Sequence, residues 1–229
     1  RPSTGMSTIR NGGRRYLTMT KSTESLWVDG IGRGEQRMLT VVLAGKSEVA
    51  SFCLRYMMSV VSDVHKDYNL LALPSKSDRE IEGLQPSFST ESTKLKVHLV
   101  KNIEELYNME DLVFVSLEYD SIIRPEKFAS KRLYNIHFSL LPKYRGVFTS
   151  ILPILNGESL SGVTLHEIDS GIDTGPIISQ ESFSIEEMDA LTLYKKYNEV
   201  AFQVFARNIL HLIENDYETR EQDDSAASY

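Results

Sequence analysis

The chain has 229 residues, of which 41% are hydrophobic and 25% charged, and its formal net charge is −7 at neutral pH. These values are ordinary for a globular protein and exclude collagen, a coiled coil and a wholly disordered chain. The only cysteine, Cys53, excludes an intrachain disulfide and a zinc site built on several cysteines. No run of about 18 apolar residues occurs, so no transmembrane helix is expected. A cytoplasmic enzyme or binding domain is the starting expectation.

The first 37 residues differ from the rest in charge and composition. They hold seven basic and three acidic residues, whereas the remainder holds 18 basic and 29 acidic residues. Because they are rich in Gly, Ser, Thr and Arg and show no helical or strand period, residues 1–37 are predicted to be a flexible N-terminal extension. The acidic remainder is a poor match for nucleic acid, whose phosphates need surplus Lys and Arg.

Apolar segments alternate from Met38 onward. Strands are predicted at Leu39–Ala44, Tyr68–Leu73, Leu95–Val100, Leu112–Leu117, Leu133–His137, Gly162–Ile168 and Pro176–Phe183. Helical spacing predicts helices over 49–60, 103–107 and about 187–214. Strands separated by helices indicate an α/β fold with a doubly wound, mostly parallel Rossmann-like sheet. We expect one folded domain over 38–215 and a C-terminal tail over 216–229 that frays from Glu218 onward.

Two polar residues stand at the end of the predicted fifth strand. Asn135 and His137 are two positions apart, so their side chains point to the same face of the sheet. In open α/β sheets, ligands bind beyond the carboxyl ends of the strands, where this pair lies. An amide can stabilise an oxyanion and an imidazole can move a proton, as acyl transfer requires. A purely structural role at the strand end is the alternative.

A second candidate is Asp173, which lies between Gly171 and Gly175. Glycines allow turns with positive φ and let a ligand approach the backbone closely. A carboxylate in this loop could orient His137 or stabilise its imidazolium form. Alternatively, it is a turn residue that hydrogen-bonds its own backbone.

Together, the two segments resemble a known family. Asn-Ile-His-Phe-Ser-Leu-Leu-Pro at 135–142, followed about thirty residues later by the glycine-flanked Asp173, is similar to the folate-dependent formyltransferases. The resemblance covers about residues 39–213. The segments 116–120 and 144–149 most resemble sugar N-formyltransferases that act on dTDP-linked amino-dideoxy sugars.

This resemblance implies a formyltransferase fold, with the catalytic domain over 38–215. It also implies that the protein catalyses formyl transfer. A formyl group would pass from the co-substrate N10-formyltetrahydrofolate, without a metal, to the amine of a dTDP-amino-dideoxy sugar. The 4-amino-4,6-dideoxyglucose type is favoured, for surface polysaccharide biosynthesis. The family's motifs imply that Asn135 and His137 hold the oxyanion of the tetrahedral intermediate. Asp173 would steer His137 and help to remove the amine proton.

The resemblance also implies two sets of binding residues. The folate would contact Tyr119, Asp120, Ile122, Ile123, Asp169, Gly171 and Ile172, although the two neighbouring isoleucines could instead belong to the core. The sugar nucleotide would contact Lys46, Lys76, Tyr144, Arg145 and Gly146, although either lysine could simply be solvated. Some relatives carry a tryptophan near the base, where this chain has Leu84.

Other functions share some of these sequence features. The chain could be the glycinamide ribonucleotide formyltransferase of purine synthesis, or a non-catalytic domain that binds folate or a nucleotide sugar. The acidic body disfavours a tRNA substrate. His137, His166 and Asp173 match no recognised metal-ligand spacing, and no Gly-x-Gly-x-x-Gly follows the first strand, so NAD is poorly supported. Family habit predicts a homodimer, whereas composition and charge predict a cytoplasmic protein with no nucleic-acid or membrane partner.

Overall fold

The computed structural model describes residues 9–11, 14–16, 38–61, 68–81 and 86–229. The chain divides into two compact units, Arg1–Gln36 and Arg37–Tyr229. In the first unit, β1 (Ile9–Asn11) pairs antiparallel with β2 (Arg14–Tyr16), where the sequence predicted no strand. The rest of the predicted extension and Leu84 lie outside the described residues.

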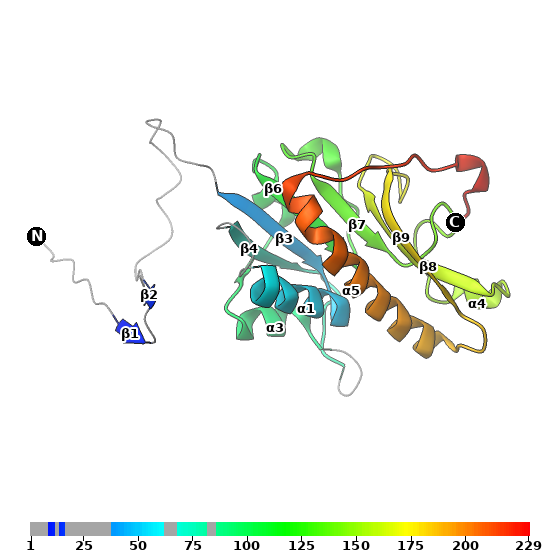
Figure 1. Ribbon diagram of the computed structural model, residues 1–229, viewed down its shortest axis with the longest axis horizontal. Coiled ribbons are helices and arrows are strands. Elements are labelled where there is room, and N and C mark those ends of the chain that lie inside the picture. The colour runs from blue at the N-terminus through cyan, green and yellow to red at the C-terminus, as the bar shows by residue number, and fades with distance from the viewer. Residues whose placement is uncertain (1–8, 12–13, 17–37, 62–67, 82–85) are drawn as a thin grey trace, which may run out of the picture. The chain divides into compact units, whose positions relative to one another are not determined.

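The second unit is built on a seven-stranded sheet in the order β5-β4-β3-β6-β7-β8-β9 (Figure 1). Its strands are β3 (Leu39–Gly45), β4 (Tyr68–Pro74), β5 (His98–Leu99), β6 (Leu112–Leu117), β7 (Leu133–His137), β8 (Leu160–Glu167) and β9 (Ile177–Ser184). Neighbouring strands from β5 to β7 are parallel, and β8 and β9 join in antiparallel pairing. The predicted mostly parallel α/β fold is confirmed.

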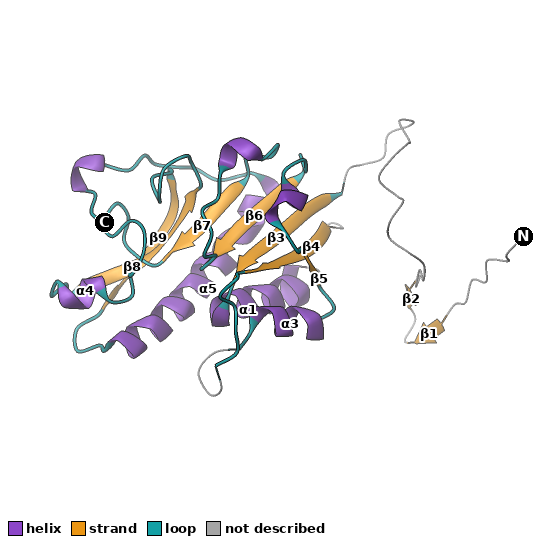
Figure 2. Cartoon of the chain, turned by 180° about the vertical axis from the view of Figure 1, so that it is seen from behind, coloured by secondary structure: helices purple, strands orange, loops and turns teal. Residues whose placement is uncertain are grey.

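Helices cover one face of this sheet (Figure 2). They are α1 (Ser47–Tyr56), continued by the π-helical turn η1 (Met57–Val61), α3 (Phe88–Lys94) and the long α5 (Ala190–Glu214). The central strands have continuous apolar runs, as expected for parallel strands that are buried on both faces of a sheet. On the opposite face, Phe114, Phe128 and Leu106 belong to a second buried apolar cluster.

Short helical segments complete the unit. They are η2 (Ile103–Leu106), η3 (Pro125–Lys127), α4 (Leu152–Leu155) and η4 (Asp224–Ala226). The predicted strand over 95–100 shrinks to β5, because α3 ends in a cap at Leu95 and Lys96 has a φ of 60°. The last helix begins at 190, since the Asp189 side chain accepts a hydrogen bond from the Thr192 amide and caps it.

The C-terminal residues do not fray, so that expectation is wrong. Arg220 forms a backbone bridge with Ile177 of β9. The Ser228 carbonyl accepts from the Arg145 amide at 2.8 Å, and the Ser228 hydroxyl accepts from the Tyr144 amide at 2.9 Å. In Figure 1 this red segment leaves the end of α5 and runs toward the β8–β9 side of the sheet. It is therefore part of the folded unit.

Candidate active site

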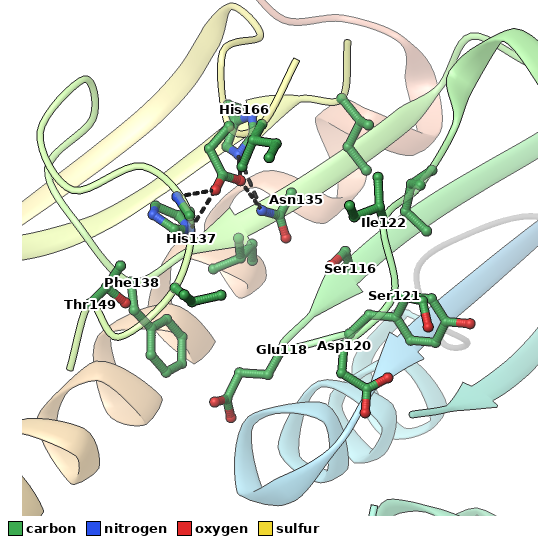
Figure 3. A pocket seen from close by; sticks show the side chains of 18 of the residues that line it. Ser116, Glu118, Asp120, Ser121, Ile122, Asn135, His137, Phe138, Thr149 and His166 are labelled. Atoms are coloured by element: carbon green, nitrogen blue, oxygen red, sulfur yellow. Dashed lines mark hydrogen bonds and ion pairs between the residues drawn. The ribbon is translucent and has the colours of Figure 1, made fainter. Parts of the chain in front are cut away.

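A cavity of about 370 Å³ opens beyond the carboxyl ends of β6 and β7 (Figure 3). Strand register explains which side chains enter it. Asn135 on β7 stands opposite Ser116 on β6 and opposite His166 on β8, so the three share one face of the sheet. His137, two residues along β7, shares that face as well. The cavity is thus framed by three strands and by the loops that follow them.

The carboxylate of Asp173 lies at the centre of this site. Its Oδ1 accepts a hydrogen bond from Asn135 Nδ2 at 3.0 Å and lies 3.4 Å from His166 Nε2. Its Oδ2 accepts from the Gly146 amide at 2.8 Å and lies 3.5 Å from His137 Nδ1. The structure therefore brings together the three residues that the sequence singled out for catalysis.

The loop that carries Asp173 depends on a close backbone approach. Asp173 itself has a φ of 53°, in the left-handed region that aspartate tolerates better than most residues. A Cβ at Gly175 would lie 1.9 Å from the Glu167 carbonyl oxygen, so only glycine fits there. Gln222 of the C-terminal segment donates to the Asp173 and Gly175 carbonyls at 2.9 and 2.7 Å. Hydrogen bonds to the backbone of this loop therefore fix the position of the Asp173 carboxylate.

Burial and neighbouring charges set the ionisation of the two groups. Burial alone would raise the pKa of Asp173, but contact with His166 and the charge of His137 outweigh it and lower the pKa to about 2. Burial lowers the pKa of His137 below its usual value, and the Asp173 carboxylate offsets this only in part. At neutral pH the site therefore holds an ionised carboxylate beside a neutral imidazole.

Hydrogen-bond partners define where the hydrogens lie. His137 Nε2 lies 2.7 Å from the Tyr144 carbonyl oxygen, which only accepts, so Nε2 carries a hydrogen. The neutral ring then has its lone pair on Nδ1, toward Asp173. His166 Nδ1 faces the Glu167 carbonyl oxygen at 2.7 Å and carries a hydrogen for the same reason. A proton that reached His137 Nδ1 would lie against the Asp173 carboxylate.

The residues predicted to contact folate all line the cavity: Tyr119, Asp120, Ile122, Ile123, Asp169, Gly171 and Ile172. Ile122 is 78% exposed, which removes the core interpretation for that residue. Asp120 is engaged, since its carboxylate accepts from the Lys76 and Ser77 amides at 3.3 and 2.9 Å. It fastens the loop after β6 to the loop after β4 and shapes the rim of the cavity.

The residues predicted to contact the sugar nucleotide divide into two groups. Lys46 and Gly146 line the cavity, but Lys76, Tyr144 and Arg145 are not among its lining residues. The buried Arg145 guanidinium donates to Asp224 at 2.7 Å, because the C-terminal segment docks against it. The Tyr144 hydroxyl donates to Glu158 at 3.0 Å. Both side chains therefore support the wall of the site rather than face its interior.

Several residues of the cavity are not among the predicted site residues, and His166 and Glu118 are the two of these that bear an imidazole or a carboxylate. The sequence pattern presents His166 only as a possible metal ligand, whereas its place opposite Asn135 on an antiparallel strand puts it in the cluster. Glu118, directly after β6, was not singled out, yet it lines the cavity together with Tyr194 of α5.

Within the described ranges, no group of three or more His, Cys, Asp or Glu side chains is arranged to hold a metal ion. Nor does any helix of the described residues have the length and apolarity needed to span a membrane.

Comparison with known proteins identifies the class to which this fold and site belong. The model of the formyl transferase family matches residues 57–209. The chain belongs to the formyl transferase family.

Three proteins illustrate the similarity. The GDP-perosamine N-formyltransferase of Brucella melitensis is 31% identical over 175 residues, which cover 74% of this chain and 62% of that protein. The chain thus spans less than two thirds of that relative. The crystal structure of WlaRD, a sugar 3N-formyl transferase in the presence of dTDP and 5-N-formyl-THF, is 41% identical, with a TM-score of 0.78 over 84% of this chain and 69% of that one. An N-formyltransferase from Helicobacter canadensis, in complex with folinic acid and dTDP-3-aminofucose, has the same identity and TM-score over 84% and 70%.

Proposed function

We propose that this protein is a sugar N-formyltransferase that moves a formyl group from N10-formyltetrahydrofolate to the amine of a nucleotide-linked amino sugar. The observation that carries the proposal is the Asp173 carboxylate, which joins Asn135 and His137 at the carboxyl edge of the sheet. The two structures at 41% identity support it, because one was determined with dTDP and 5-N-formyl-THF and the other with folinic acid and a dTDP-amino sugar.

The folate would enter where the cavity is apolar at its rim. Ile122 and Ile172 are exposed there and offer flat apolar surface to a pterin ring. Burying such side chains against a ligand is favourable by about 25 cal/mol for each Å² of apolar surface. The backbone of the loops 119–123 and 169–173 supplies donors and acceptors for the edge of the ring. No metal takes part in this proposal.

The transfer is a direct attack on the formyl carbon. The neutral amine forms a C–N bond, and the formyl oxygen becomes an oxyanion. A proton leaves the amine for His137 Nδ1, where the Asp173 carboxylate stabilises the imidazolium. The intermediate then collapses, the bond from the formyl carbon to N10 breaks, and N10 takes the proton from the His137 imidazolium, which leaves tetrahydrofolate and a neutral imidazole.

Asn135 is proposed to hold the oxyanion during this step. One of its Nδ2 hydrogens is engaged by Asp173, and Nδ2 also lies 3.2 Å from His166 Nε2. In the absence of substrate both Nδ2 hydrogens are thus engaged, and the one that faces His166 Nε2, at the longer distance, would turn to the formyl oxygen when substrate binds. A donor of this kind is worth roughly 2.7–4 kcal/mol in the transition state.

The acceptor is proposed to be a dTDP-linked 3-amino-dideoxy hexose. Of the two proteins at 41% identity, one is a sugar 3N-formyl transferase and the other was determined with dTDP-3-aminofucose. The 4-amino-4,6-dideoxyglucose acceptor expected from the sequence stays a prediction, as do polysaccharide biosynthesis, the homodimer and the cytoplasm. Lys46 lines the cavity beyond β3, which supports its proposed contact with the diphosphate. For Lys76, Tyr144 and Arg145, contact with the substrate stays a prediction.

The direct test incubates the protein with N10-formyltetrahydrofolate and a panel of acceptors, followed by mass spectrometry of the products. The panel holds dTDP-3-amino and dTDP-4-amino dideoxy hexoses, GDP-perosamine and glycinamide ribonucleotide. We expect a gain of one formyl group on a dTDP-amino sugar. A gain on glycinamide ribonucleotide alone would assign the protein to purine synthesis, and no gain on any acceptor would leave a folate- or nucleotide-binding domain.

A further inference from the structure

The cavity contains a second, partly buried carboxylate that the transfer chemistry does not use, that of Glu118. It follows β6 directly and lines the cavity. Figure 3 shows Glu118 away from the Asn135–His137 cluster, with its carboxylate on another wall of the cavity. A buried carboxylate is unfavourable unless polar partners compensate it. Its surroundings therefore indicate what it is for.

Two hydroxyl groups from separate helices hold this carboxylate. Ser47 Oγ, at the start of α1, donates to Glu118 Oε2 at 2.5 Å, and the Tyr194 hydroxyl of α5 donates to the same oxygen at 2.8 Å. Both hydrogen bonds that the described residues give the carboxylate end on Oε2. The other oxygen, Oε1, is therefore the acceptor that remains for a ligand in the cavity.

The backbone around this group is unusual. Glu118 and Ser47 have φ values of 59° and 63°, in the left-handed region that residues other than glycine rarely adopt. The two segments meet because Gly45 lets β3 approach β6, and a Cβ at that position would lie 1.9 Å from the Leu117 oxygen. Sparsely populated conformations of this kind cluster at ligand sites, where the surrounding structure enforces them.

Sheet order places a cation, a carboxylate and an imidazole in a sequence along the cavity. Lys46 follows β3, Glu118 follows β6 and His137 ends β7, and these strands are neighbours in that order. The pKa of the Glu118 carboxyl lies above its usual value, because burial outweighs the lowering effects of the hydrogen bonds from Ser47 and Tyr194 and of the Lys46 charge. A nucleotide sugar has the same order of chemistry, namely anionic diphosphate, hydroxylated hexose and reactive amine.

We infer that Glu118 Oε1 accepts a hydrogen bond from a ring hydroxyl of the acceptor hexose, with Ser47 and Tyr194 holding the carboxylate in place. This inference rests on the proposed function and deepens it, because it assigns the residue that selects a hydroxylated amino hexose. A sugar that lacks this hydroxyl would leave Glu118 Oε1 without a hydrogen-bond donor. Sites that are built to bind a hydroxyl generally discriminate against such an analogue, because the polar group of the site is then unpaired.

The test is a cycle that changes enzyme and substrate together. Wild type and Glu118→Ala are assayed with a dTDP-3-amino-3,6-dideoxyhexose and with its 2-deoxy and 4-deoxy analogues. For wild type, removal of the hydroxyl that Glu118 binds is expected to lower kcat/KM about tenfold or more, mainly through KM. For Glu118→Ala, the hydroxylated sugar and that analogue should be used almost equally.

Two further variants keep the test decisive. Glu118→Gln retains an oxygen for Ser47 and Tyr194 but replaces the free acceptor with an amide donor, so it should lose most of the discrimination even if the alanine variant does not fold. Glu126→Gln, a change at an exposed glutamate of η3, should leave discrimination as in wild type.

The outcomes separate this inference from the proposed function. If wild type formylates a dTDP-amino sugar but both Glu118 variants lose the same factor as wild type on each deoxy analogue, the role of Glu118 is overturned and the function stands. If wild type formylates no amino-sugar nucleotide, the proposed function itself fails.

Discussion

The Asp173 side chain meets an amide, two imidazoles and a backbone N–H within a few ångströms. Its two oxygens have different tasks. Oδ1 orients Asn135, and Oδ2 faces the nitrogen of His137 that carries the lone pair. We expect Asp173→Asn to lower kcat by about a hundredfold or more, because proton transfer to a positioned group contributes that much. Steady-state kinetics with a dTDP-amino sugar measures it, and a loss below threefold would remove Asp173 from the chemistry.

The pH profile tests the same residues in another way. His137 must be neutral to accept the amine proton, and its pKa lies below the usual value because it is buried. The rate should thus be level near neutral pH and fall as pH drops through the His137 pKa. The Asp173 carboxylate raises that pKa, so Asp173→Asn should move the acidic limb of kcat to lower pH. An unmoved limb, or one that moves to higher pH, would contradict this assignment.

At the scale of single residues, the sequence was sufficient to find Asn135, His137 and Asp173. The two-residue period of a strand fixes the face that Asn135 and His137 share, whatever surrounds it. Glu118 carries no such signal. Its importance comes from Ser47 and Tyr194, which are distant in the chain and reach it only through the packing of α1 and α5.

Among the elements, the C-terminal segment has the most direct effect on the site. The Gln222 amide donates to two carbonyls of the Asp173 loop, and its oxygen accepts from the Arg145 guanidinium at 2.9 Å. One side chain thereby links the loop that carries Asp173 to the loop whose Tyr144 carbonyl holds His137. The segment therefore acts as a clamp that holds these two loops together.

Loosening this clamp should slow turnover without weakening substrate binding. We expect Gln222→Ala to lower kcat about tenfold or more, since small misplacements of catalytic groups are costly, while KM for the amino sugar changes little. Gln222→Glu, which removes the donor at similar size, should behave alike. Glu221→Ala, at the exposed neighbouring residue, is the control. Equal kcat in all three variants and wild type would show that the segment does not position Asp173.

The elements also show where sequence patterns stop. Apolar runs identified the central strands and α5 closely. Strands buried on both faces need continuous apolar residues, and a helix buried along one side needs an apolar stripe, so both leave a clear sequence pattern. The docking of the tail could not be predicted, since its partners are largely backbone groups such as the Tyr144 amide and the Asp173 carbonyl, which leave no trace in side-chain pattern.

For the molecule as a whole, the junction of β3 and β6 links stability to the site. At Gly45 a methyl group would lie 1.9 Å from the Leu117 oxygen, whereas at Gly157, with a φ of 66°, nothing lies within 4 Å. Gly45→Ala should destabilise the protein by about 3 kcal/mol or more, and Gly157→Ala by only about 1 kcal/mol. Urea unfolding compares them, and equal losses would show that β3 and β6 tolerate greater separation.

The overall architecture followed from the alternation of strands and helices, and the parallel order from the right-handed crossover rule. The antiparallel β8 and β9 place His166 beside Asn135 and bring the Asp173 loop back over the sheet. The apolar pattern predicted that these two strands exist but not that they run antiparallel to their neighbours. Strand direction depends on the path of the connecting loops, which the apolar pattern does not encode.

The central claim is that a formyl group crosses this cleft from folate to an amine under the control of Asp173. Its most direct test supplies N10-formyltetrahydrofolate labelled with ¹³C in the formyl group together with a dTDP-3-amino-dideoxy hexose, and follows the label by NMR. Wild type is expected to place the label on the sugar amine in one-to-one ratio with tetrahydrofolate released, and Asp173→Asn is expected to do so about a hundredfold more slowly. Label that never reaches an amino sugar with wild type, or that arrives equally fast with Asp173→Asn, would contradict this claim.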